Sequence, residues 1–521
     1  MLLHHIVEHA ASAAPGTTLL VADEGRWSAR SFNELVARLG SGIAAHVEPG
    51  ERVAIIADNR AEFAAALYAV PRAGAVLVMG NTRHTETELA ELLNSTGAAA
   101  VIATGPHLDR LLPLAEQLPT VRTWWNLDDE PRPGAGPVAE LVAHDVVPPV
   151  ARDERDVAWL IPTSGTTGRA KGALLTHRSL VAAALNSAVG RPVTDDDVYL
   201  FPFPLFHVAA YNVLQLHLRR RTVVLAPRFD AVDVMRTIER EGVTMMSLAP
   251  TMLAMMLDHP ERARCDLSSL RQISYGASAM PLDLLRRSLH DLPDVGLAQG
   301  YGMTELSGNA VFLGPEEHRR AASDRPELLR AAGRPGPLVE LRIADDDGRA
   351  LATGTDGEIL VRGDQVTVGY WNQPEADANA FHVDDDGTRW LRTGDIGRID
   401  DDGYLYVVDR KKDIIITGGE NVASREVEDV LSEHPHVAGV AVVGVPDATW
   451  GEAVCTVVVW RGDVAARAEV GATVEGLIEW SRDRLAGFKR PRRVVEVDEL
   501  PVNASGKIDK RALRELLDRF H

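Results

Sequence analysis

The stretch Val157-Ala-Trp-Leu-Ile-Pro-Thr-Ser-Gly-Thr-Thr-Gly-Arg-Ala-Lys-Gly172 joins an apolar run to a loop of glycines and hydroxyl-bearing residues. The apolar run predicts a buried strand. In the loop, glycines allow backbone N–H groups to point into one cavity, hydroxyls add donors, and Lys171 adds a full positive charge. This combination suits a polyphosphate, although the Gly-Lys-Ser/Thr ending of a Walker A loop is absent. The candidate phosphate-binding residues are Thr163, Ser164, Gly165, Thr166, Thr167, Gly168 and Lys171.

Helix and strand signals alternate on both sides of this loop. Ser31 and Glu34 are spaced as a capping box, as are Thr85 and Glu88, and short apolar runs such as 53–56 and 99–103 predict strands. Alternation of this kind predicts an α/β fold with mostly parallel sheets. Residues 330–408 instead contain short strand runs between Gly/Asp turns, which predict a small antiparallel or barrel-like subdomain.

The pattern changes again after Lys411-Lys412, where the residues predict a compact α+β unit. We therefore expect two domains: a large core of several subdomains over residues 1–410 and a small, mobile domain over residues 411–521.

The composition limits the partners and the compartment. The formal net charge of −20 argues against nucleic acid and anionic membranes as partners. No apolar run reaches the roughly 18 residues of a membrane span, and the N-terminal segment has no signal-peptide pattern. The two cysteines, Cys265 and Cys455, form no disulfide framework, which fits a reducing cytoplasm.

Lysine is scarce, with only six residues among 55 basic ones: Lys171, Lys411, Lys412, Lys489, Lys507 and Lys510. A lysine offers a compact, rotatable point charge, whereas the arginine guanidinium is a broad planar fork. These lysines are therefore candidates for roles that arginine cannot fill.

Further motifs follow the phosphate loop in order. They are Gln299-Gly-Tyr-Gly-Met-Thr-Glu305, Leu391-Arg-Thr-Gly-Asp395, the segment 404–413 with Gly418-Gly-Glu-Asn421, and Pro501-Val-Asn-Ala-Ser-Gly-Lys507. Together they resemble the motifs of the adenylate-forming superfamily, which contains acyl-CoA and aryl-CoA synthetases, nonribosomal adenylation domains and luciferases. The resemblance covers nearly the whole chain, and five motifs in the right order are specific.

The resemblance implies ATP, Mg²⁺ and coenzyme A as cofactors. It places Tyr301 against adenine, Thr304 at the α-phosphate, Glu305 on Mg²⁺, and Asp395 at the ribose hydroxyls with Arg410 nearby. One carboxylate suffices for a magnesium ion that is also bound by phosphates. Further residues expected at the nucleotide are Gly276, Ala277 and Gly302.

In the C-terminal unit, the resemblance implies two alternating arrangements. In one, Lys507 bridges the carboxylate and the phosphate during adenylation. In the other, the face of Gly418 and Gly419 reaches the site and opens a path for the thiol, and Lys412 is the hinge.

The resemblance also suggests where the acid binds. His207 lies where amino-acid-activating members have aspartate, which argues against an α-amino acid; His207 is a candidate gate for the thiol. Tyr211, Asn212, Ala249, Ser278 and Gly300 are expected to line the acyl site, without a basic residue in these segments. A medium- or long-chain fatty acid is favoured, with an aromatic, cinnamate-like acid as the alternative.

Several alternatives remain open. Ala423-Ser424 replaces a bulkier residue and a proline, so the acceptor is either coenzyme A or the phosphopantetheine of an acyl carrier protein. A homodimer is also left open. A non-catalytic binding relative is the main rival class, but binding alone does not require the bridging Lys507.

Overall fold

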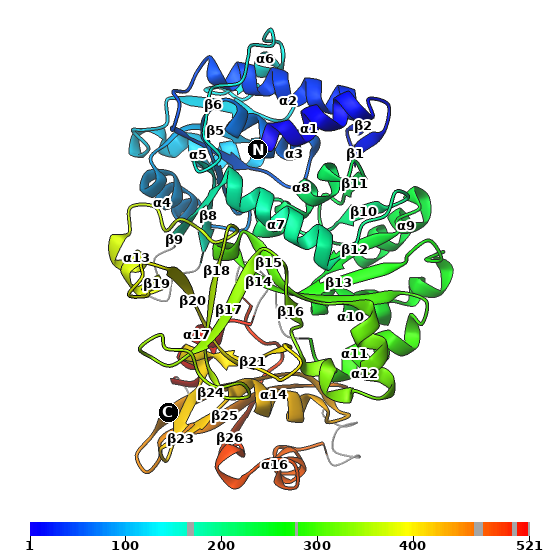
Figure 1. Ribbon diagram of the computed structural model, residues 1–521, viewed down its shortest axis with the longest axis vertical. Coiled ribbons are helices and arrows are strands. Elements are labelled where there is room, and N and C mark those ends of the chain that lie inside the picture. The colour runs from blue at the N-terminus through cyan, green and yellow to red at the C-terminus, as the bar shows by residue number, and fades with distance from the viewer. Residues whose placement is uncertain (164–170, 277–279, 463–471, 503–507, 519–521) are drawn as a thin grey trace.

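A computed structural model describes residues 1–163, 171–276, 280–462, 472–502 and 508–518. Two large sheets form its upper part (Figure 1). The first has the strand order β16-β15-β14-β13-β12-β10-β11-β1-β2 and is parallel from β1 through β14 along that path. Its strands are β1 Thr18–Ala22, β2 Gly25–Ser28, β10 Val198–Phe201, β11 Thr222–Leu225, β12 Met245–Leu248, β13 Gln272–Gly276, β14 Gly296–Met303, β15 Gly308–Leu313 and β16 Arg334–Pro335.

The second large sheet has the order β7-β6-β5-β3-β4-β8-β9, and only its β8–β9 pair is antiparallel. Its strands are β3 Arg52–Ile56, β4 Val76–Met79, β5 Ala98–Ala103, β6 Thr123–Asn126, β7 Gly136–Pro137, β8 Val157–Thr163 and β9 Lys171–Thr176. The prediction of an α/β fold with mostly parallel sheets is therefore confirmed.

Helices α1 Leu3–Ala13, α2 Ala29–Ala44, α3 Ala61–Arg72, α7 His177–Gly190 and α8 Tyr211–Leu218 share one apolar core with strands of both sheets. Every residue of α3 except Glu62 is buried, as expected for an alanine-rich helix that packs on nearly all sides. The remaining helices of this region are α4 Glu86–Thr96, α5 Gly105–Leu111, α6 Val138–Val142, α9 Ala231–Glu241, α10 Pro250–Asp258, α11 Leu282–Asp291 and α12 Pro315–Ser323.

The helix starts show how local sequence decides the boundaries. The capping box at Thr85 and Glu88 is confirmed, because the Thr85 hydroxyl accepts from the Glu88 N–H. The box expected at Ser31 and Glu34 is wrong. Strand β2 ends at Ser28, whose hydroxyl already accepts from the Ser31 N–H, so α2 begins three residues earlier.

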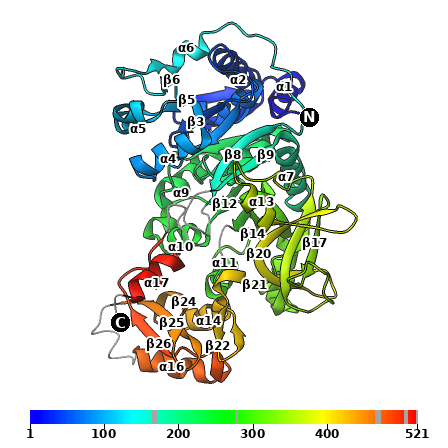
Figure 2. The same ribbon diagram turned by 90° about the vertical axis from the view of Figure 1, so that its left-hand side faces the viewer.

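Two smaller sheets complete the fold. The small antiparallel or barrel-like subdomain predicted for residues 330–408 is a five-stranded antiparallel sheet. It contains β17 Val339–Ala344, β18 Gly357–Gly363, β19 Phe381–Val383, β20 Arg389–Ile399 and β21 Leu405–Arg410, with α13 Pro374–Ala380. The C-terminal sheet comprises β22 Ile415–Thr417, β23 Glu420–Val422, β24 Val437–Asp447, β25 Gly451–Trp460 and β26 Arg493–Glu496, with helices α14 Ser424–Ser432, α16 Val474–Arg482 and α17 Lys510–Asp518. These last elements gather at the lower end of the molecule in both views (Figures 1 and 2). Among the described residues, no helix is both long and apolar enough to cross a bilayer.

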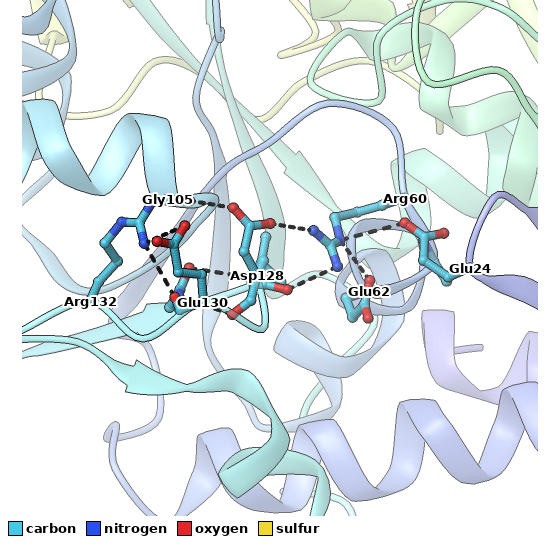
Figure 3. A network of polar contacts seen from close by, with 10 residues as sticks. Glu24, Arg60, Glu62, Gly105, Asp128, Glu130 and Arg132 are labelled. Carbon is cyan, nitrogen blue, oxygen red and sulfur yellow. Dashed lines mark hydrogen bonds and ion pairs between the residues drawn. The ribbon is translucent and has the colours of Figure 1, made fainter.

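A network of ion pairs and hydrogen bonds connects loops at one end of the second large sheet (Figure 3). Arg60, at the start of α3, lies within 2.8 Å of Glu62, 3.1 Å of Asp128 and 3.8 Å of Glu24. Asp128 in turn accepts from the Gly105 N–H at the start of α5, at 2.7 Å. One arginine thus joins the β1–β2 turn, α3 and the segment after β6.

We expect Arg60→Ala to lower the free energy of unfolding by roughly 1–3 kcal/mol, because it leaves three partly buried carboxylates without their cation. Thermal unfolding measures the effect. The matched control is Arg122→Ala, which removes an exposed ion pair to Glu51 and should cost less than about 1 kcal/mol. An equal loss of unfolding free energy in the two variants would show that the Arg60 network stabilises the fold no more than an exposed ion pair does.

Candidate functional site

Strands β8 and β9 hold the predicted phosphate loop. They pair antiparallel, which places Thr163 opposite Lys171, and the Thr163 hydroxyl donates to the Lys171 carbonyl at 3.3 Å. Ser164, Gly165, Thr166, Thr167 and Gly168 lie outside the described residues, as do Ala277, Ser278 and Lys507.

Tyr370 contacts two predicted site residues, one with its ring face and one with its hydroxyl. The Lys171 ammonium lies 4.8 Å from the ring centre, a cation–π contact. The Tyr370 hydroxyl donates to Glu305 Oε1 at 2.9 Å, and burial together with the Glu305 charge raises the pKa of Tyr370. The tyrosine therefore stays protonated and holds one oxygen of the Glu305 carboxylate in place.

Glu305 has the environment of a cation ligand. Glu305 is 7% exposed, and among the described residues no basic nitrogen lies within 4.0 Å of its carboxylate. It belongs to the short turn Thr304–Leu306 between β14 and β15, where Ser307 adopts a φ of 54° and Gly308 one of 144°. A buried carboxylate without a cationic side chain fits a hard divalent ion.

Glycines at the strand ends keep the neighbouring backbones close. Gly276, the last residue of β13, is paired with Gly300 within the parallel strand β14. A Cβ on Gly276 would lie 2.7 Å from the Gly300 carbonyl oxygen, and one on Gly302 would lie 2.1 Å from the Gly308 carbonyl oxygen. In open parallel sheets, ligands bind beyond the carboxyl ends of the strands, so these positions border the expected site.

Asp395, in β20 of the antiparallel subdomain, connects this subdomain to Tyr301 in β14. The Tyr301 hydroxyl donates to Asp395 Oδ2 at 2.6 Å, and Arg410 Nε lies 2.8 Å from Oδ1. Asp395 is 4% exposed and is paired with Arg410 between β20 and β21. Burial and the Asp395 charge raise the pKa of Tyr301 well above its usual value, so this hydroxyl remains a donor.

The residues predicted to line the acyl-binding site lie in separate segments. Tyr211 and Asn212 begin α8 and are buried, Ala249 precedes α10 directly after β12, and His207 precedes the short helix Val208–Ala210. Tyr211 lies close to the turn that carries Glu305, since a Cβ on Gly308 would lie 2.7 Å from the Tyr211 ring carbons.

The predicted hinge lies between two anchored neighbours. Lys411 forms ion pairs with Asp346 at 2.7 Å and Glu358 at 3.3 Å, whereas Asp413 pairs with Arg514 of α17 at 3.2 Å. Lys412, between them, is exposed.

Gly418 and Gly419 form the two-residue turn of the β22–β23 hairpin and are exposed. Their φ values of 60° and 84° are disfavoured for other residues, which explains the glycine pair.

Sequence reasoning missed two side chains of this region. Tyr370 lies far from the motifs that supply its partners Lys171 and Glu305. Arg191 donates to Tyr211 and Asn212 from the end of α7. The only signal for Tyr370 was an aromatic pair, Tyr370-Trp371, in a glycine-rich connection; Arg191 had none.

Comparison with known families gives two matches. The family described as "AMP-binding enzyme" matches residues 7–371, and "AMP-binding enzyme C-terminal domain" matches residues 426–507.

Individual relatives match over nearly the whole chain. A 3-[(3aS,4S,7aS)-7a-methyl-1,5-dioxo-octahydro-1H-inden-4-yl]propanoyl:CoA ligase of Mycobacterium tuberculosis is 38% identical over 96% of each chain. The long-chain-fatty-acid–CoA ligase FadD13 of the same species is 36% identical over 90% of this chain and 88% of its own. Among solved structures, o-succinylbenzoate coenzyme A synthetase from Bacillus subtilis, in complex with ATP and magnesium ion, has a TM-score of 0.82 and 30% identity over 98% of this chain and 99% of its own.

Proposed function

Because this chain belongs to the AMP-binding enzyme family, the superfamily that its motifs indicated, we propose that it is an ATP-dependent acid–thiol ligase. It activates a carboxylic acid as an acyl-adenylate with release of pyrophosphate, then transfers the acyl group to coenzyme A with release of AMP. The main structural support is the arrangement of Lys171, Tyr370 and Glu305, which holds a cation and a metal-binding carboxylate beside the strand ends. ATP and Mg²⁺ accompany a structural neighbour, and curated relatives are named as CoA ligases, in agreement with the expected cofactors.

The proposed roles follow the positions of the side chains. Lys171 and the phosphate loop bind the β- and γ-phosphates, and Glu305 binds Mg²⁺. Magnesium, when bound, neutralises phosphate charge during attack. Thr304, the first residue of the turn that carries Glu305, donates to the α-phosphate, and Tyr301 packs against adenine while its hydroxyl stays on Asp395.

Lys507 completes the site for the first half-reaction. It bridges the carboxylate and the α-phosphate, both of which are anionic. We propose the division at residues 410 and 411. The hinge is Lys412, because its neighbour Lys411 pairs with the antiparallel subdomain of the core, whereas Asp413 pairs with α17 of the C-terminal unit. After the movement, the Gly418–Gly419 turn lines the thiol path, and His207 gates it.

For the acid, we propose a largely apolar molecule, first of all a medium- or long-chain fatty acid. The named acids of the relatives differ widely, so an alicyclic or aromatic acid is the second candidate. The small side chain of Ala249, directly after β12, agrees with such acids. The glycines serve close packing instead, because a Cβ on Gly276 would meet the Gly300 carbonyl oxygen and one on Gly300 would meet the Asn309 side chain.

Pyrophosphate release with a panel of fatty, aryl, alicyclic and amino acids tests this function. We expect turnover with one apolar class and a strong increase on addition of coenzyme A. Activation of an acid without stimulation by coenzyme A would point to an acyl carrier protein as acceptor. Absence of pyrophosphate with every acid would favour the non-catalytic alternative.

We expect Asp395→Asn to raise the KM for ATP roughly 10- to 100-fold with a smaller effect on kcat. The change weakens charge-assisted bonds to the ribose and to Arg410, which act equally in the ground state and the transition state. Steady-state kinetics at varied ATP measure the effect. The matched control is Tyr301→Phe, which keeps the ring for stacking and should change the KM by only a few-fold; a larger loss in Tyr301→Phe than in Asp395→Asn would contradict the assigned roles.

A cytoplasmic location remains a proposal, supported by two thiols that are both unpaired. The homodimer also remains open, and the molecular mass in solution would test it.

A further inference from the structure

Arg191 is a buried cation at the C-terminal end of α7, with 3% of its surface exposed. Its Nη2 donates to Tyr211 Oη at 3.1 Å, Asn212 Oδ1 at 2.5 Å and Gln215 Oε1 at 2.8 Å. Its Nη1 donates to Ser247 Oγ at 3.3 Å. All of these acceptors are uncharged, and each is itself buried.

The guanidinium is incompletely satisfied. Among the described residues, no carboxylate lies within 4.0 Å of Arg191, and its Nε has no hydrogen-bond partner. A guanidinium carries five N–H donors, and a buried charge without a counter-charge is costly. An acceptor from a ligand would satisfy Nε and stabilise the charge.

The surroundings of Arg191 are the predicted acyl-binding segments. Tyr211 lies between Arg191 and Gly308, and Gly308 is paired with Met303 directly before the turn of Thr304 and Glu305. On the other side, Ser247 is in β12 just before Ala249. Arg191 therefore contacts the hydroxyl end of Tyr211, whereas the Tyr211 ring lies against Gly308, next to the turn that carries Thr304 and Glu305.

We propose that the acid carries a hydrogen-bond-accepting oxygen, a carbonyl or a second carboxylate, at its end remote from the activated carboxylate, and that Arg191 Nε donates to it. This inference rests on the proposed function and narrows its substrate class. The apolar body of the acid lies along Tyr211, and the oxygen supplies the acceptor that the buried cation lacks. An acid without this oxygen leaves the donor unsatisfied and binds more weakly.

Binding of matched acids, measured by calorimetry, tests the proposal without requiring turnover. The series pairs alkanoic and cycloalkyl-propanoic acids of increasing length with their distal keto and distal carboxylate analogues. At the fitting length, we expect one oxygenated analogue to bind roughly 10- to 100-fold more tightly than its unsubstituted partner. The keto and carboxylate arms show which oxygen is preferred.

Two variants assign the preference to Arg191. Arg191→Met should give equal affinities for the oxygenated and the unsubstituted acid of each pair. Arg191→Lys keeps the charge but lacks the Nε–H, so it should strongly reduce the preference for the oxygenated acid. The ratio is the readout because partial loss of folding weakens both acids alike. The matched control is Arg72→Met: Arg72 is also buried with an unpartnered Nε, but it is in α3, where the Glu8 carboxylate opposes the effect of burial on its pKa.

The outcomes separate the two proposals. Equal affinities for oxygenated and unsubstituted acids, or the same ratio in wild type and Arg191→Met, would overturn the role of Arg191. A preserved preference without pyrophosphate release would refute the ligase function and leave the binding role of Arg191 standing.

Discussion

Replacing Lys507 with alanine should reduce acyl-adenylate formation by roughly 100- to 1,000-fold or more, while thioester formation from pre-made acyl-AMP stays largely intact. The first half-reaction brings a carboxylate against a phosphate, and a single ammonium between them lowers the repulsion where charge develops. In the second half-reaction the adenylate already exists, and in the proposed second arrangement of the C-terminal unit Lys507 is no longer needed. Pyrophosphate exchange and single-turnover thioester formation measure the two steps separately.

Lys489→Ala is the matched control, because it removes a lysine from the same C-terminal unit, where its ammonium pairs with Glu426 at 2.7 Å. This variant should leave adenylation nearly unchanged. An equal loss of both half-reactions in Lys507→Ala would contradict the alternation of the domain.

Glu305→Gln should lower the rate of adenylation roughly 100-fold at limiting Mg²⁺, with partial recovery as the metal concentration rises. The amide keeps the shape and an acceptor oxygen but removes the charge that a hard cation prefers. Since Tyr370 already occupies Oε1, the variant also replaces a charge-assisted bond by a neutral one. Magnesium titrations of pyrophosphate release give the apparent metal affinity.

Tyr370→Phe separates these two contributions. It removes the hydroxyl while keeping the ring beneath Lys171 and the full charge of Glu305. We expect a change of less than about tenfold in the magnesium requirement. An unchanged magnesium dependence in Glu305→Gln would remove Glu305 from the metal site.

Individual strands and helices could be predicted from the sequence, because each of them depends on a local pattern of apolar residues and capping side chains. Short continuous apolar runs predicted β3 and β5, and the capping box at Thr85 predicted the start of α4. The start of α2 was misplaced because two serines three residues apart compete as caps, and only the end of β2 decides between them.

The site could be predicted only where motifs name its residues. The contact of Tyr370 with Lys171 and Glu305 depends on three segments that meet in space, and no periodicity marks it. Arg191 illustrates the same limit: the acyl segments contain no basic residue, yet the fold brings one from the end of α7 to Tyr211.

The scarcity of lysine was an imperfect guide. Lys171 lies over the ring of Tyr370, which also binds Glu305, and its role at the phosphates stays a prediction. However, Lys489 and Lys510 form ion pairs with Glu426 and Glu428 in the C-terminal unit, a task that arginine performs elsewhere in the chain. Composition alone therefore cannot separate a catalytic lysine from a structural one.

The most direct test of the central claim is the identity and ratio of the nucleotide products formed from ATP in the presence of an accepted acid, Mg²⁺ and coenzyme A. We predict one AMP and one pyrophosphate for each acyl-CoA, with pyrophosphate appearing before the thioester in a rapid-mixing experiment. Formation of ADP and phosphate, or acyl-CoA without AMP, would contradict an adenylate intermediate and the assignment of this site.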